Sequence, residues 1–135
     1  MRRIARTGSV GVLVGMLLAV LTGCANQDGE QQAAGVAARF LDAAGRGDTA
    51  TACALLTPRV REDQAVAEGQ SCARSLPVDR LRGGAVTGTD VWSEWARVST
   101  DGGAVFLTEF DSGWLVTAAG CQPNGDAPYR CVVGG

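Results

Sequence analysis

The stretch AVFLTEFDSGWLVTAAGC, residues 104 to 121, decides the fold. Its two partly apolar runs flank Ser112-Gly113, a pair typical of a tight β-hairpin turn. Side chains in a strand alternate between the two faces of the sheet. In the first run, Phe106, Thr108 and Phe110 share one face, and Val105, Leu107 and Glu109 share the other. In the second run, Trp114, Val116 and Ala118 share one face, and Leu115, Thr117 and Ala119 share the other. Both faces are partly apolar. We expect one to meet helices and the other to form a pocket wall, a dimer surface or a partly covered sheet.

The residues before and after this hairpin extend the sheet. Strands are expected over 85–89 and 91–100, and Asp101-Gly102-Gly103 predicts a second hairpin turn. A last short strand is expected over 129–133, after a loop rich in Pro, Asn and Gly. The pattern therefore predicts an antiparallel meander of four to five strands.

Helical patterns come before the strands. One apolar stripe has helical spacing and starts a helix near Gln32: Ala33, Val36, Ala37, Phe40, Leu41 and Ala44. Asp48 is expected to cap a helix over 49–56, and Thr57-Pro58 to begin another that reaches about residue 67. A short helical turn is expected over 71–75. Helices followed by a meander indicate an α+β fold, with two to three N-terminal helices packed on one face of the sheet.

The N-terminus has the pattern of an export signal. Three arginines precede the uncharged run 10–21, which as a helix is about 18 Å long, whereas a bilayer core measures about 30 Å. Leu21-Thr22-Gly23-Cys24 resembles the bacterial lipobox. The resemblance implies cleavage between Gly23 and Cys24, a diacylglyceryl group on the Cys24 thiol, and a lipid anchor in the cell membrane on its extracytoplasmic face. We expect a signal peptide over 1–23, the lipidated cysteine and a flexible tether over 24–31, and one α+β domain over 32–135.

Four cysteines remain if Cys24 carries lipid. An even number in a small exported domain predicts two disulfides, with three possible pairings. We favour Cys53–Cys72 and Cys121–Cys131 because each pair lies within one local unit. A zinc site does not fit, since the chain has no Cys-x-x-Cys spacing and no histidine.

Composition restricts the chemistry. All 12 basic residues are arginine, so histidine-dependent catalysis and lysine Schiff-base chemistry are excluded. The mature part has nine arginines against 14 acidic residues, which argues against nucleic acid and anionic lipid as electrostatic partners. We expect no catalytic residue, metal or cofactor. The alternative is a hydrolase acting through Glu109 and Asp111, about 7 Å apart on one strand, with Glu94 as a further candidate. Trp92, Trp95 and Trp114 are expected in the core rather than in a ligand platform.

Several segments resemble a known group. The stretch 52–58, ACALLTP, follows a helix that ends in Gly-Asp, and later come VFL at 105–107, GWLV at 113–116, AGCQP at 119–123 and PYRC at 128–131. Together they resemble small exported lipoproteins of high-GC Gram-positive bacteria. The resemblance implies a cystatin-like or NTF2-like fold, with helices against a curved sheet. Its motifs assign no catalytic residue, and fold alone does not define function. We expect a non-enzymatic domain that binds a small apolar ligand or a protein partner.

Overall fold

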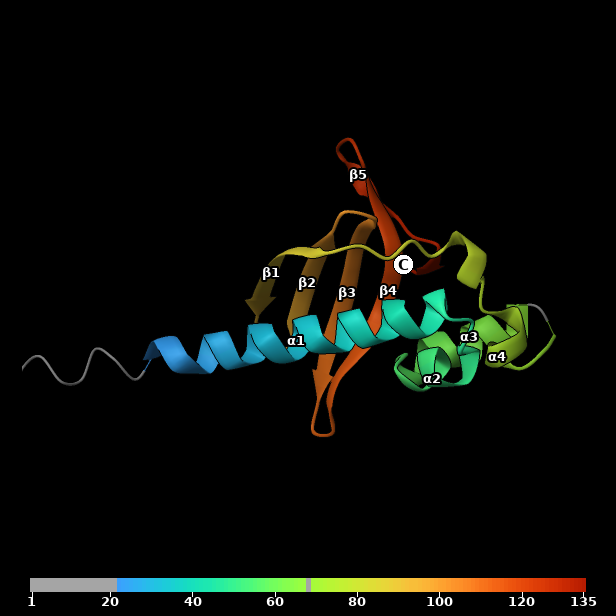
Figure 1. Cartoon of the computed structure of the whole chain (residues 1–135), viewed down its shortest axis with the longest axis horizontal. Coiled ribbons are helices and arrows are strands. Elements are labelled where there is room, and N and C mark those ends of the chain that lie inside the picture. The colour runs from blue at the N-terminus through green and yellow to red at the C-terminus, as the bar shows by residue number, and fades with distance from the viewer. Residues whose placement is uncertain (1–21, 68) are drawn as a thin grey trace, which may run out of the picture.

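The computed structural model describes residues 22–67 and 69–135, so the run 10–21 and Leu21 of the lipobox lie outside the described residues. The described chain is α+β, as expected, with helices before an antiparallel sheet (Figure 1). Its elements are α1 (Thr22–Gly45), α2 (Thr49–Ala54), α3 (Pro58–Ala67), α4 (Cys72–Ser75), a 3-10 turn (Val78–Arg80), β1 (Val86–Trp92), β2 (Trp95–Thr100), β3 (Gly103–Phe110), β4 (Gly113–Asn124), β5 (Ala127–Arg130) and β6 (Val133–Gly134).

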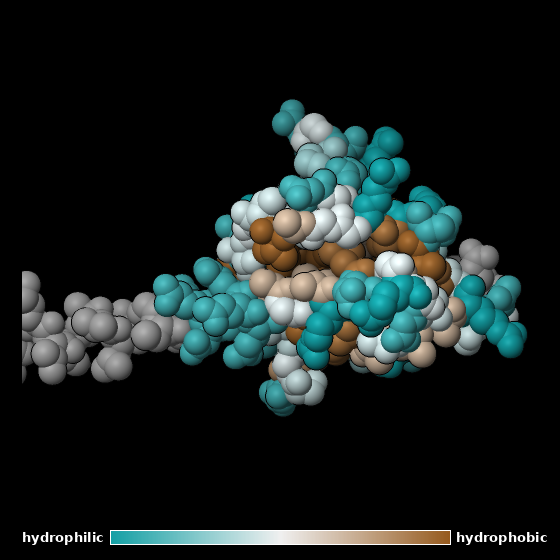
Figure 2. All heavy atoms as spheres, in the orientation of Figure 1, coloured by the Kyte–Doolittle hydropathy of each residue, from teal (hydrophilic) through white to brown (hydrophobic). Residues whose placement is uncertain are grey.

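α1 begins earlier than the sequence indicated. We expected it to start at Gln32, but it is helical from Thr22 and therefore includes the segment proposed as a tether. The polar residues of that segment are compatible with a helix because their side chains can remain in water. In Figure 1 the first turns of α1 project beyond the sheet, and Figure 2 shows them as hydrophilic. The division of the chain at residues 24–31 remains a prediction.

The sheet is a meander in the order β1-β2-β3-β4-β5, and β6 also pairs with β4. The hairpin turns expected at residues 101–103 and 112–113 are confirmed. The expected continuous strand 91–100 is wrong, because the chain reverses at Ser93-Glu94 between β1 and β2. Ser93 reverses the chain with φ 53°, a conformation unusual for a residue other than glycine. The expected last strand is divided into β5 and β6.

α1 crosses one face of the sheet and encloses the core with it (Figure 1). The expected faces of β3 are confirmed, since Val105 and Leu107 are buried in this core. In β4 the expected alternation fails after Thr117, because a register irregularity places Ala119 with the core and Ala118 in a separate cluster on the other face. The largest fully buried side chains are Phe40, Leu56, Val98, Val105, Leu107, Val116, Cys121 and Val133.

Two connections hold the remaining helices in place. The segment between α2 and α3 lies along the open edge of β4, where Thr57 N–H donates to Val116 O at 2.9 Å and Val116 N–H donates to Leu55 O at 2.8 Å. These bonds satisfy backbone groups that an edge strand would otherwise expose.

Both expected disulfides are present, Cys53–Cys72 between α2 and α4 and Cys121–Cys131 across the β5 hairpin.

Candidate functional site

The face of the sheet turned away from α1 carries several exposed aromatic side chains. Directly paired residues in an antiparallel ladder lie on the same face, and the register pairs Trp92 with Trp95 and Trp95 with Thr108. Trp92 is 49% exposed, and Trp95 and Phe110 are each 43% exposed. We call this surface the aromatic face and define it by Trp92, Trp95, Phe106, Phe110 and Tyr129.

Beside Trp95 and Phe110 the aromatic face is hollowed into an apolar groove of about 400 Å³. The start of α3, at residues 57–59, forms its other wall. That wall is fixed by the backbone bonds to Val116 and by the Thr57 hydroxyl, which accepts from Val60 N–H at 3.4 Å. Thr108 and Thr117 line the groove, and their hydroxyls are hydrogen-bonded to each other at 2.8 Å. The groove therefore has an aromatic wall of Trp95 and Phe110, a second wall of Thr57, Pro58 and Arg59, and the hydroxyl pair of Thr108 and Thr117.

The opposite half of the aromatic face is more polar. Arg97 donates two hydrogen bonds to Asp90 Oδ2, from Nε at 3.1 Å and from Nη2 at 2.7 Å. Hydrogen bonds with Asp90 and then Tyr129 raise the pKa of Arg97, which remains a cation. Tyr129 of β5 packs edge-on against Phe106 with ring centroids 5.1 Å apart. Arg97 therefore presents its charge at the surface as part of an exposed ion pair with Asp90.

The three candidate carboxylates lie in the β1–β2 turn, in β3 and in the turn after β3. Glu94 lies in the β1–β2 turn, and its backbone carbonyl accepts a hydrogen bond from Glu109 N–H at 2.8 Å. The backbones of these two residues are therefore in contact. Glu109 pairs with Trp114 and belongs to the face of β3 that carries the core residues. The expectation that Glu109 and Asp111 share a strand is wrong, because β3 ends at Phe110 and Asp111 lies in the following turn.

The tryptophans also depart in part from the expectation. Trp114 is buried as expected, with 4% exposure, whereas Trp92 and Trp95 are on the surface. The sequence signal for this was available: two aromatic residues separated by the polar pair Ser93-Glu94 fit a two-residue hairpin turn. We missed it because neither turn residue is glycine or asparagine.

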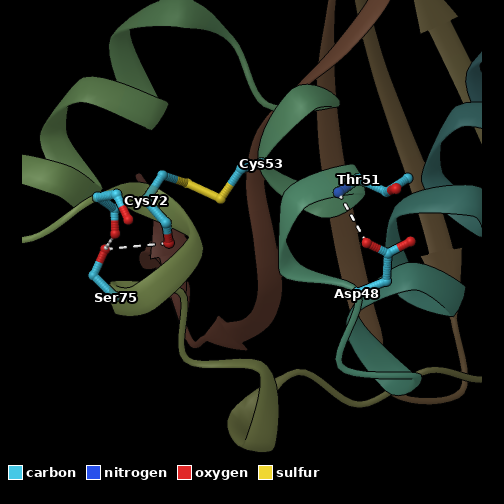
Figure 3. The surroundings of a disulfide bond; sticks show 6 residues. Asp48, Thr51, Cys53, Cys72 and Ser75 are labelled. Atoms are coloured by element: carbon cyan, nitrogen blue, oxygen red, sulfur yellow. Dashed lines mark hydrogen bonds between the residues drawn. A yellow bond between two sulfur atoms is a disulfide. The ribbon is translucent and has the colours of Figure 1, made fainter.

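A second groove, of about 530 Å³, lies between α2, α3 and α4 beside the Cys53–Cys72 disulfide. Figure 3 shows how the disulfide joins α2 to α4, and how the Asp48 carboxylate accepts from Thr51 N–H at the start of α2. Hydrogen bonds from the Thr51 side chain and backbone lower the pKa of Asp48. The groove lining combines four alanines and the disulfide with the polar side chains of Arg61, Glu62 and Ser71.

The remaining predicted site residues lie in the lipobox. Thr22, Gly23 and Cys24 belong to the first turn of α1. No helix within the described ranges is long and apolar enough to cross a bilayer. Over the same part of the chain, no three His, Cys, Asp or Glu residues are grouped as a metal site would require.

Comparison of the chain with known protein families, with curated proteins and with solved structures finds no match.

Proposed function

We propose that this chain is a lipid-anchored lipoprotein on the extracytoplasmic face of the cell membrane, and that its α+β domain binds a partner without catalysing a reaction. The lipobox at residues 21–24 supports the anchor. The single observation that supports the binding role is the aromatic face, where Trp95 and Phe110 border an apolar groove while each is 43% exposed. Contiguous exposed apolar patches mark interaction sites, and tryptophan is enriched among the residues that contribute most to binding.

The chemistry of the groove favours a small apolar ligand or an apolar side chain of a protein partner. Aromatic rings provide a large contact area with little loss of conformational freedom, and the Thr108–Thr117 pair can exchange its mutual bond for one to a ligand. We further propose that the fold belongs to the cystatin-like or NTF2-like group. The long helix across an antiparallel sheet with irregular β3–β4 pairing supports this assignment.

The alternative, a carboxylate hydrolase, has less support. A carboxyl group acting as an acid near neutral pH needs a raised pKa. In Glu94 the hydrogen bond from the Ser93 hydroxyl lowers the pKa instead. Glu109 and Asp111 belong to different local elements, a strand and a turn. We therefore place this function second.

Native mass spectrometry of the detergent-extracted mature protein tests the proposal. We expect a chain that starts at lipidated Cys24 and retains an apolar ligand or a partner subunit. Phe110→Ser should lose that species, because it removes one wall of the groove. Val66→Ser is the matched control, since Val66 is 80% exposed on α3 and does not line the groove. No bound species in the wild type, or equal retention in both variants, would count against a binding role for the aromatic face.

A further inference from the structure

The expected lipid anchor lies close to the exposed tryptophans. A Cβ built on Gly29 of α1 would lie 3.9 Å from Val91 Cγ1, so this part of the helix is next to the end of β1. Val91 is followed by Trp92, which begins the turn to Trp95. Cys24 comes five residues before Gly29 in the same helix, a distance of about 7.5 Å along the helix axis. The N-terminal end of α1 and the β1–β2 turn are therefore at the same end of the domain, and the rings of Trp92 and Trp95 project there from the face of the sheet turned away from α1.

We propose that Trp92 and Trp95 insert into the lipid–water interface of the membrane that holds Cys24. We call residues 92–95 the tryptophan turn. The inference rests on the proposed lipidation of Cys24, and it names the bilayer surface as the partner of this end of the aromatic face. Cys24 then attaches the domain at one point, and the tryptophan turn provides a second contact that fixes its orientation.

The side chains of the turn suit this position. Tryptophan has an apolar ring with one N–H donor, and such rings concentrate at the headgroup level of membranes. Trp92 and Trp95 are cross-strand partners, so their side chains project from the same face of the hairpin. Between them in the chain lie only Ser93 and Glu94, both exposed polar residues that can stay among the headgroups. The turn can therefore enter the interface but not the hydrocarbon core.

The anchor makes a weak contact sufficient. A surface tethered within a few nanometres of its partner acts at a high effective concentration, so the second contact needs little affinity of its own. Charge does not provide the attraction, because Asp28, Glu30 and Glu94 give this end an acidic character. The contact is therefore expected with zwitterionic lipid, and insertion of the rings is its source.

The proposed orientation explains the position of the apolar groove. Trp95 belongs both to the tryptophan turn and to the groove wall. With the turn at the interface, the groove opens beside the bilayer, where apolar molecules partition.

Tryptophan fluorescence of the lipidated mature protein in vesicles tests the proposal. The vesicles are made either of phosphatidylcholine or of phosphatidylcholine brominated on its acyl chains, which quenches nearby indole rings. We expect the brominated lipid to cause a loss of emission in the wild type and in Val66→Ser. The double variant Trp92→Ser, Trp95→Ser retains only buried Trp114, and its emission should not change between the two vesicles.

The other outcomes overturn the inference in distinguishable ways. If brominated lipid does not quench the emission but acrylamide in the surrounding buffer does, the tryptophan turn lies in water. Emission protected from both quenchers shows that a second copy or another protein covers the turn. The mass of the same sample reports the lipid on Cys24. A chain without lipid overturns the proposed function and this inference together, whereas a lipidated chain without lipid quenching overturns this inference alone.

Discussion

Trp114 differs from the other two tryptophans because its ring is buried between α1 and the sheet. Its side chain is 4% exposed, and its indole N–H has no hydrogen-bond partner among the described residues. An unpaired buried donor costs about 1–3 kcal/mol, which reduces the net stabilisation that the ring provides.

Trp114→Phe should therefore change the free energy of unfolding by less than about 1 kcal/mol, since the loss of volume is offset by removal of the unpaired N–H. Trp114→Ala leaves a large cavity and should destabilise by about 3–5 kcal/mol. Urea denaturation followed by circular dichroism measures both values. A loss of clearly more than about 1 kcal/mol in Trp114→Phe would show that the indole N–H has a partner.

At the scale of the element, α2 is short and depends on its cap. The Thr51 hydrogen bonds lower the pKa of Asp48 below its ordinary value of 3.8. A depressed folded-state pKa contributes stability above the unfolded-state value, and that contribution is lost as the pH falls through the folded-state value.

Asp48→Ala should therefore be less stable than the wild type at neutral pH, and the difference should shrink as the pH is lowered below about 4. Asp48→Asn keeps an oxygen acceptor that does not titrate, so it is the matched control. Thermal melts of the three proteins from pH 2 to pH 7 measure the effect. A difference between wild type and Asp48→Ala that is the same at every pH would contradict the assigned role of the cap.

The two disulfides join different elements and close loops of different length. Cys53 and Cys72 are 19 residues apart, and Cys121 and Cys131 are 10 apart. Replacing Cys53 and Cys72 together by alanine should cost about 3 kcal/mol, and replacing the second pair slightly less. For a domain of this size the first change should lower the Tm by more than about 10 °C. Calorimetry of the oxidised proteins checks this, and an unchanged Tm would show that the disulfide adds no constraint.

Much of the element order could be predicted because the determining interactions are local. The glycine-containing turns before β3 and β4, the apolar stripe of α1 and the cap at Asp48 are each encoded within a few residues. The tight turn at Ser93 was missed because neither of its two central residues is glycine or asparagine, although Trp92 and Trp95 flank it and Ser93 has a positive φ. The early start of α1 was missed because a polar segment has no apolar periodicity.

At the scale of the whole molecule, the sequence predicted two layers but not which residues would be left uncovered. Alternation assigned Phe106, Thr108 and Phe110 to one face of β3, yet only the packing of α1 on the opposite face shows that theirs is the open one. The groove was also beyond sequence reasoning. It needs the start of α3 beside Trp95, and the contact with β4 that holds it there spans 59 residues between Thr57 and Val116.

The proposed location of the whole molecule depends on the proposed lipid attachment. Cys24→Ala removes the thiol that is proposed to accept the diacylglyceryl group, so this variant should be released from the membrane or accumulate unprocessed. Two or more acyl chains give lasting attachment, whereas one is marginal. Fractionation of cells and the intact mass of the protein measure the change. Unchanged membrane retention, processing and mature mass in Cys24→Ala would refute the lipidation.

The most direct test of the central claim compares two double variants in cells that lack the wild-type chain. Trp95→Ser with Phe110→Ser alters the aromatic face, and Glu109→Gln with Asp111→Asn removes the candidate carboxylates. Envelope integrity is measured, with protein abundance and membrane attachment determined in the same cells. The account predicts that the first variant is present and anchored but does not restore envelope integrity, whereas the second restores it like the wild type. A normally abundant, anchored but inactive carboxylate variant beside an active aromatic-face variant would contradict the account and favour the hydrolase.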